Sequence, residues 1–344
     1  MPLIDSSFRP ALGLGHGVAQ TVFPLLARRL PAVPVVRERW DTRDGDFVDV
    51  DVLPAERPEG FLVIVHGLEG SSRSQYVLGM LARAARAGLG AIALNFRSCS
   101  GEMNRYARSY HSGETGDLGA VVERAIERWP GIPGAIAGFS LGANVTLRRL
   151  AEWGRGGPDA IRAAVAVSCP FDLALCGDTL DTPSSFWVRS HFLYHLKRKA
   201  LAKAAVFPSE IDARRVRAAR TIRRFDDIVT APLNGFRDAA EYWERCSSGP
   251  VLDRVARPVL LLSARDDPLI PASCHPVEVA RGSDLLHLEA PARGGHVGFV
   301  AGSLLAPRFY AEERAMEFIG ERLGLSARAD AAAPAGAPGG LQAA

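Results

Sequence analysis

The sequence predicts an α/β fold: a mostly parallel central sheet flanked by helices, with one helical insertion. Short apolar runs rich in β-branched residues suit strands that are buried on both faces of a parallel sheet. Helical patterns alternate with these runs, which is typical of βαβ units. A long segment, residues 171–250, then interrupts the alternation. The expected helices cover residues about 73–87, 115–129 and 141–153.

The composition is that of an ordinary globular enzyme-sized chain. Its 344 residues are 47% hydrophobic and 23% charged, with a net charge of +3. This small charge gives no indication of a nucleic-acid partner. The five cysteines show no C-x-x-C spacing, so we expect reduced thiols and a cytoplasmic location. We find neither a signal peptide nor a run approaching the roughly 20 apolar residues of a transmembrane segment.

Taken in order, the chain begins with an N-terminal arm, residues 1–45, which is rich in Pro and Arg. Residues 47–52 alternate apolar and acidic side chains, which indicates a half-exposed edge strand. They open the main domain, residues 46–325, whose last strand is expected at residues 285–289. The buried strands between them are predicted at residues 61–65, 91–94, 135–137, 163–167 and 259–262.

Two segments stand apart from this alternation. Residues 171–250 lie between two predicted sheet strands, and we expect them to form a helical lid over the carboxyl ends of the strands. Residues 326–344 are rich in Ala, Pro and Gly with few large apolar side chains. They are predicted to be a disordered tail.

The stretch Gly138-Phe139-Ser140-Leu141-Gly142 reads G-x-S-x-G between a predicted strand and a predicted helix. A serine on such a sharp turn presents its hydroxyl above the sheet, and the flanking Gly138 and Gly142 avoid clashes with neighbouring elements. Ser140 is therefore the candidate nucleophile.

A serine hydroxyl needs a base and an acid that orients the base. His296 lies in the glycine-rich loop after the predicted last strand and is the candidate base. Asp267 follows the strand at 259–262 and is the preferred acid, because it starts the Asp-x-x-x-Pro turn counted back from Pro271. Its neighbour Asp266 is the alternative.

An oxyanion hole needs two backbone N–H donors. Leu141 follows the nucleophile and begins a helix, and Leu68 lies in the His66-Gly67-Leu68 turn after the strand at 61–65. Both N–H groups are candidates, with His66 and Gly67 supporting the loop.

No cofactor and no metal is expected. His191 and His195 are spaced i, i+4, but no H-E-x-x-H pattern accompanies them, so we place them on a lid helix. The aromatic residues around them fit an apolar acyl site or the core of the lid equally well. They are Phe186, Trp187, Phe192 and Tyr194.

Several blocks together resemble the AB hydrolase 4 (YheT-like) family of the α/β-hydrolase superfamily, over residues about 10–324. The resemblance implies an α/β-hydrolase fold, a carboxylesterase preferring short- to medium-chain acyl esters, and Ser140, Asp267 and His296 as charge-relay residues. Ser98 departs from the family's usual glycine. The blocks are Gly15-His16 with Gln20-Thr21, residues 66–71, 95–102, 110–115, 225–227 and 266–268, and Gly294-Gly295-His296-Val297-Gly298-Phe299.

The expected function is a serine carboxylic-ester hydrolase that acts through an acyl-enzyme on a small-molecule ester, with a monomer as the default state. With the resemblance, the expected substrates are short- to medium-chain acyl esters or related lipid-like esters. Two alternatives stay open. An acyltransferase would use an alcohol in place of water, and a ligand-binding protein on the same fold would lack turnover.

Overall fold

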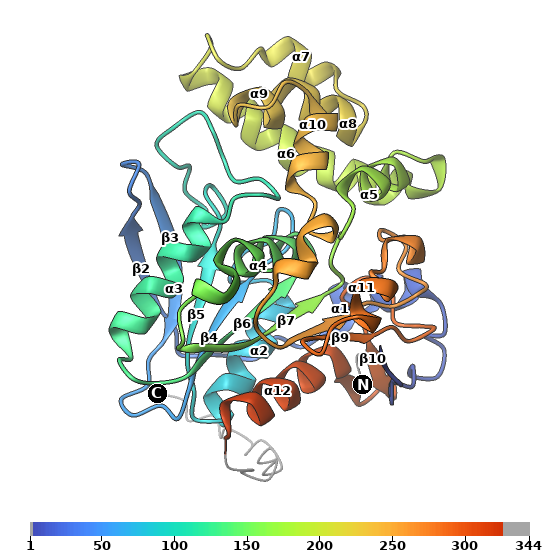
Figure 1. Ribbon diagram of the computed structural model, residues 1–344. Helices are drawn as coiled ribbons and strands as arrows, with labels where there is room; N and C mark the ends of the chain where they lie inside the picture. The colour runs from blue at the N-terminus through green and yellow to red at the C-terminus, as the bar shows by residue number, and fades with distance from the viewer. Residues whose placement is uncertain (1–2, 326–344) are drawn as a thin grey trace, which may run out of the picture.

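The computed structural model describes residues 3–325 and contains a nine-stranded sheet with helices on both faces and further helices above one end (Figure 1). The strand order is β1-β9-β8-β7-β6-β4-β5-β3-β2. Within this nine-stranded sheet, only the pairs β2–β3 and β3–β5 are antiparallel. The predicted mostly parallel α/β sheet with a helical insertion is therefore confirmed. The predicted tail, residues 326–344, lies outside the described residues.

The predicted strands and helices match the observed ones closely in the central part of the chain. The strands are β1 (Leu3–Ile4), β2 (Val36–Asp41), β3 (Phe47–Leu53), β4 (Phe61–Val65), β5 (Gly90–Asn95), β6 (Gly134–Phe139), β7 (Ile161–Val167), β8 (Val259–Leu262), β9 (Leu286–Glu289), β10 (Val300–Gly302) and β11 (Pro307–Phe309). The helices outside the insertion are α1 (Gly17–Ala27), α2 (Gln75–Arg86), α3 (Gly116–Arg128), α4 (Leu141–Trp153), α11 (Val277–Arg281) and α12 (Tyr310–Leu323).

Two hydrophobic layers hold the sheet. Helices α3, α4 and α11 pack on one face, and α2 and α12 pack on the other. Strands β4 and β8 are buried along their whole length, as expected for central strands covered on both faces.

The insertion between β7 and β8 forms a layer that we call the helical cap, α5 to α10. Figure 1 shows it above one end of the sheet. At this end β6 leads into α4 and β7 leads into the cap. Its helices pack around their own apolar cluster. They are α5 (Leu173–Leu180), α6 (Phe186–Val206), α7 (Ala213–Ala218), α8 (Ile222–Phe225), α9 (Ala231–Leu233) and α10 (Ala239–Cys246).

The prediction of a half-exposed edge strand at residues 47–52 is wrong. Strand β3 is buried throughout, because β2 pairs with it on its outer side. The acidic side chains of β3 accept hydrogen bonds from arginines of β2: Asp49 from Arg39 and Asp51 from Arg37. The alternating acids thus reflect ion pairs across a strand pair rather than exposure to solvent.

The N-terminal segment is more than an arm around the domain, since it supplies both edges of the sheet. β1 pairs with β9 at one edge, and β2 forms the other edge. The structure also contains the small hairpin β10–β11, which follows the strand predicted as the last one. α1 packs on this hairpin.

Arg97, directly after β5, is a buried cation that joins three acidic residues. It donates to Asp117 at 2.7 and 2.8 Å, to Asp44 at 2.7 Å and to Asp46 at 3.3 Å. Removing one partner of such a buried cluster leaves uncompensated charge.

We therefore expect Arg97→Met to lower the free energy of unfolding by about 3–5 kcal/mol, measured by urea denaturation. Arg43→Met is the matched control, because Arg43 is exposed and pairs with an exposed Glu123. Equal urea midpoints for the two variants would contradict the structural role of the Arg97 cluster.

Candidate active site

Ser140 occupies a sharp turn between β6 and α4. Its backbone has φ 53° and ψ −122°, an unfavourable conformation for a residue with a side chain. The turn is tight enough to require glycine: a Cβ on Gly142 would lie 2.4 Å from the His66 carbonyl oxygen, and one on Gly138 would lie 2.5 Å from the Gly142 oxygen. The chain thus lifts the Ser140 side chain out of the strand end.

Three side chains from three strand-end loops form one chain of hydrogen bonds. His296 Nε2 lies 2.9 Å from Ser140 Oγ, and His296 Nδ1 lies 2.9 Å from Asp267 Oδ2. The other oxygen of Asp267 accepts the N–H groups of Leu269 and Ile270 at 2.8 and 3.1 Å. These bonds fix the carboxylate, and the carboxylate in turn fixes the orientation of the imidazole ring.

The alternative acid, Asp266, points away from this chain. Its Oδ1 accepts the N–H of Gly295 at 3.0 Å, and its backbone carbonyl lies against Gly17 of the N-terminal segment. The structure brings Asp267, and not Asp266, to His296.

The loop that carries His296 is held by residues far away in the sequence. The His296 N–H donates to Thr21 Oγ1 at 2.8 Å, and the Val297 N–H donates to Ser168 Oγ at 3.0 Å. Val297 and Phe299 both have positive φ, at 55° and 45°, which costs free energy for non-glycine residues. Thr21 and Ser168 therefore act as positioning residues. Thr21 belongs to one of the blocks that carry the resemblance, but no sequence pattern links either residue to the His296 loop.

Thr21→Val tests this positioning role. The change removes the acceptor of the His296 N–H at almost constant volume, so we expect kcat for an ester to fall by about tenfold, with KM little changed. Thr21→Ser keeps the hydroxyl and is expected to restore most of the rate. A serine variant as slow as the valine variant would show that packing, and not this hydrogen bond, is what matters.

The two proposed oxyanion donors lie beside the nucleophile. Gly67 N–H is bound by the Tyr76 hydroxyl and Glu69 N–H by the Tyr110 hydroxyl, at 2.9 and 2.8 Å. Within residues 3–325, the Leu68 N–H between them has no hydrogen-bond acceptor. Leu141 is the first residue of α4, where N–H groups lack intrahelical partners. Leu68, Leu141 and Ser140 line the same cavity.

His66 is fully buried beneath this loop. Its Nδ1 lies 2.7 Å from the Gly67 oxygen, and its Nε2 accepts the Phe96 N–H at 3.1 Å. Burial lowers the pKa of His66 to about 4, so the ring is neutral at physiological pH. The ring therefore connects the Leu68 loop to Phe96, the first residue after β5.

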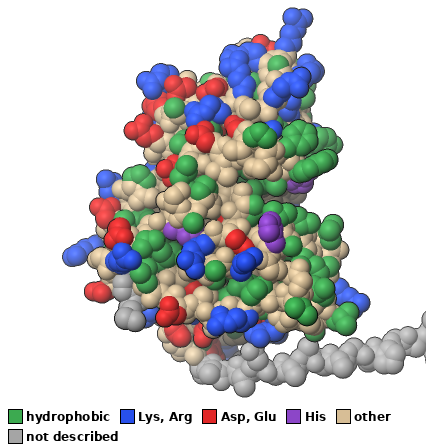
Figure 2. Space-filling model, turned by 90° about the vertical axis from the view of Figure 1, so that its right-hand side faces the viewer, with side chains coloured by type: hydrophobic (Ala, Val, Ile, Leu, Met, Phe, Trp, Pro, Cys, Tyr) green, Lys and Arg blue, Asp and Glu red, His purple; other side chains and the backbone are tan. Residues whose placement is uncertain are grey.

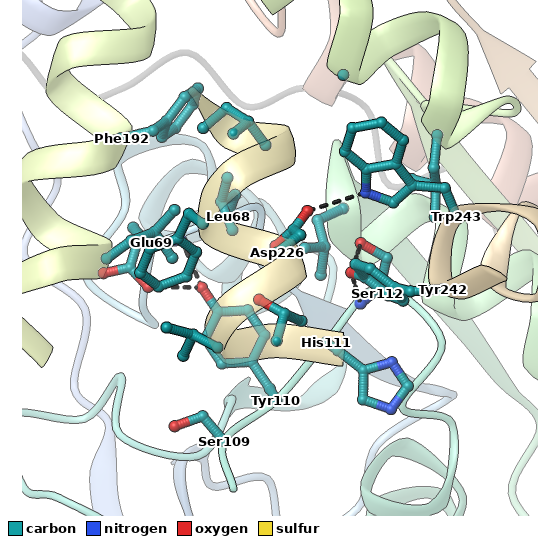
Figure 3. A pocket seen from close by; sticks show the side chains of 18 of the residues that line it. Leu68, Glu69, Ser109, Tyr110, His111, Ser112, Phe192, Asp226, Tyr242 and Trp243 are labelled. Atoms are coloured by element: carbon teal, nitrogen blue, oxygen red, sulfur yellow. Dashed lines mark hydrogen bonds between the residues drawn. The ribbon is translucent and has the colours of Figure 1, made fainter. Parts of the chain in front are cut away.

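A cavity of about 160 Å³ lies between the strand ends and the helical cap, with Ser140 and His296 in its wall. Its polar side chains largely bind one another: Tyr110 donates to Glu69, Tyr242 to Ser112, and Trp243 to Asp226 (Figure 3). The rest of the cavity wall is mostly apolar surface contributed by the cap. The apolar lining residues include Leu173, Leu180, Phe192, Leu196, Ile222, Phe225, Val229 and Leu233.

The predicted lid aromatics divide between two places. Phe192 lines the cavity, whereas Phe186, Trp187 and Tyr194 are 51%, 82% and 64% exposed. These three form neither an acyl site nor the core of the cap.

His191 and His195 lie on α6, as predicted for a lid helix, and their rings meet edge to face with centroids 4.7 Å apart. The described residues contain no group of three His, Cys, Asp or Glu side chains that could hold a metal ion. In residues 3–325, no helix combines the length and apolarity needed to cross a membrane.

Comparisons with known proteins show what this chain is similar to. A sequence model described as the alpha/beta hydrolase fold matches residues 60–301. "Putative esterase YheT" of Escherichia coli (strain K12) is 35% identical over 320 residues, 92% of this chain and 93% of that protein. "Phospholipase ABHD3" of Mus musculus is 28% identical over 312 residues, 88% of this chain and 75% of that protein.

Solved structures show the same fold. An esterase of Pyrococcus furiosus superposes with a TM-score of 0.56 at 16% identity, covering 85% of this chain and 92% of that one. At this level of identity the likeness concerns the fold alone.

Proposed function

Because the chain belongs to the alpha/beta hydrolase fold family, together with YheT, we propose that it is a serine carboxylic-ester hydrolase that works through an acyl-enzyme. The observation that carries this proposal is the hydrogen-bonded chain from Ser140 through His296 to Asp267. In it, a nucleophile, a base and an orienting acid are already within bonding distance.

In the first half-reaction, Ser140 Oγ attacks the ester carbonyl carbon while His296 Nε2 takes the hydroxyl proton. The negative charge that develops on the carbonyl oxygen is stabilised by the N–H groups of Leu68 and Leu141. The tetrahedral intermediate collapses, the alcohol leaves with the proton from His296, and the acyl group stays on Ser140. Asp267 stabilises the imidazolium while it exists.

In the second half-reaction, His296 takes a proton from a water molecule, and the resulting hydroxide attacks the acyl carbonyl. The same two N–H groups stabilise the second oxyanion. His296 then returns the proton to Ser140 Oγ, and the carboxylic acid is released. The protein requires no cofactor for these steps, because every proton moves through His296.

The lining of the cavity favours esters with short- to medium-chain acyl groups as the substrates. Its wall is mainly aliphatic and aromatic, and most of its polar atoms are occupied by other side chains. An acyl chain buried there gains hydrophobic free energy, and among the described lining residues Asn234 Oδ1 is the one buried side-chain atom without a hydrogen-bond partner.

An alkyl fluorophosphonate probe and a chromogenic ester series test the proposal. We expect the probe to label one residue, with the modified peptide containing Ser140. In the ester series, kcat/KM should rise with acyl length and then fall when the chain exceeds the cavity. A protein that resists the probe and hydrolyses none of the esters would refute an ester hydrolase, and labelling at another serine would refute the assigned nucleophile.

A further inference from the structure

Helix α1 (Gly17–Ala27) has apolar residues on both of its faces and no charged residue in its eleven positions. Its inner face, with Ala19 and Phe23, packs on the hairpin β10–β11. A helix on a protein surface ordinarily carries polar side chains outside. Here the outer face instead carries Val18, Val22, Leu25 and Leu26, which are 50%, 39%, 68% and 82% exposed.

Neighbouring segments extend this apolar surface. Leu12 is 92% exposed, and Leu304 and Leu305 at the hairpin turn are 50% and 99% exposed. The segments are joined: Ala11 N–H donates to the Val300 oxygen at 2.9 Å, and the Leu304 side chain lies next to Gly13. We define the α1 patch as Leu12, Val18, Val22, Leu25, Leu26, Leu30, Leu304 and Leu305. A contiguous apolar surface of this kind marks an interaction site.

The chain segments that carry the patch are basic. Residues 6–37 and 290–311 contain six arginines and no Asp or Glu. Among residues 3–325, three of these arginines, Arg9, Arg29 and Arg293, are exposed and form no ion pair with a carboxylate. A second copy of the chain would bring these like charges together. A partner that is apolar inside and negatively charged at its boundary would match both the exposed apolar side chains and the arginines of the patch.

The α1 patch lies next to the loops of the candidate active site. α1 holds the His296 loop through Thr21. On the other side, the exposed Phe186 and Trp187 begin α6, whose Phe192 packs on Leu269 and Ile270 beyond Asp267. Figure 2 shows hydrophobic side chains gathered on this face both over the cap and over the sheet domain below it.

We propose that the α1 patch docks on an anionic lipid bilayer and that the candidate active site draws its ester from that bilayer. The substrate class is then an ester lipid. The membrane interface then receives the side chains of Leu25, Leu26, Leu304 and Leu305. The lipid phosphates are contacted by Arg9, Arg29 and Arg293. This inference rests on the proposed function for the choice of substrate, but the docking step does not depend on it.

Vesicle sedimentation tests the docking step. We expect the protein to bind vesicles of phosphatidylcholine with phosphatidylglycerol more strongly than vesicles of phosphatidylcholine alone. The double variant Leu25→Glu/Leu26→Glu should bind about tenfold more weakly, because both apolar contact and charge attraction are reduced. Val36→Glu/Val206→Glu is the matched control, since both valines are exposed, at 56% and 61%, and lie outside the patch.

Activity measurements separate the two proposals. Leu25→Glu/Leu26→Glu should keep wild-type rates on a water-soluble short ester and lose most of the rate on an ester lipid in vesicles. Vesicle binding equal to that of the wild type would overturn the docking proposal. So would a dimer in lipid-free solution that the double variant abolishes, because the patch would then be a contact between copies. Patch-dependent binding by a protein inactive on every ester would leave docking standing and refute the hydrolase function.

Discussion

Ser140→Ala is expected to lower kcat for a chromogenic ester by about 10⁶-fold and to abolish labelling by a fluorophosphonate. The hydroxyl is the atom that forms the acyl-enzyme, so the remaining rate would come only from binding and the oxyanion donors. The measurement is single-turnover hydrolysis at saturating ester, where kcat is separated from binding.

The fold of this variant provides the control. Ser140 has a strained backbone, and alanine keeps the same backbone with a smaller side chain. We expect a thermal unfolding midpoint equal to or slightly above that of the wild type. A folded Ser140→Ala protein that still turns over ester near the wild-type rate would refute the role assigned to this serine.

Asp267→Asn and Asp266→Asn form a matched pair with opposite expected outcomes. Asp267→Asn should lower kcat by about 10⁴-fold, because an amide in place of the carboxylate favours the wrong tautomer of His296 and cannot stabilise its charged form. Asp266→Asn keeps an oxygen for the Gly295 N–H and should cost less than about tenfold.

The pH profile of the pair adds a second measurement. Partial activity of Asp267→Asn should increase at higher pH, where hydroxide can replace the lost general base. If Asp266→Asn were the slower of the two variants, the hydrogen bond that His296 donates to Asp267 would not be the one that orients the base, and the alternative acid would have to be preferred.

The central part of the fold could be predicted because its signals are local. Strands such as β4 and β8 are continuous apolar runs, and helices such as α4 have bounds that the sequence pattern matches. The grouping of Ser140, Asp267 and His296 could also be predicted, because each residue lies in the loop that follows a strand. Parallel strands bring such loops to the same edge of the sheet.

The remaining features depend on partners far away in the sequence. The sequence of β3 indicates an exposed edge strand because apolar and acidic residues alternate in it. Nothing in the sequence identifies the arginines of β2 as the partners of these acids. Thr21 accepts a hydrogen bond from a residue 275 positions away, and neither residue carries a sign of the other. Pairings of this kind are set by tertiary structure rather than by propensity.

Ser98 illustrates an intermediate case. The resemblance places a glycine at this position, and the structure gives Ser98 a φ of 64°, a conformation that glycine adopts without cost. Its hydroxyl donates to the Asn104 side chain at 2.6 Å and accepts the Asn104 N–H at 3.2 Å, which offsets part of that cost. The sequence indicates where the loop departs from the family, and only the structure shows how it is compensated.

The pairing of β1 with β9 has a consequence for the growing polypeptide on the ribosome. Residues 3–4 are synthesised long before residues 288–289, with which they pair. Thr21 is likewise synthesised long before His296, from whose N–H it accepts a hydrogen bond. A nascent chain therefore contains Ser140 long before it contains His296, and the proposed hydrolytic activity requires synthesis beyond residue 296.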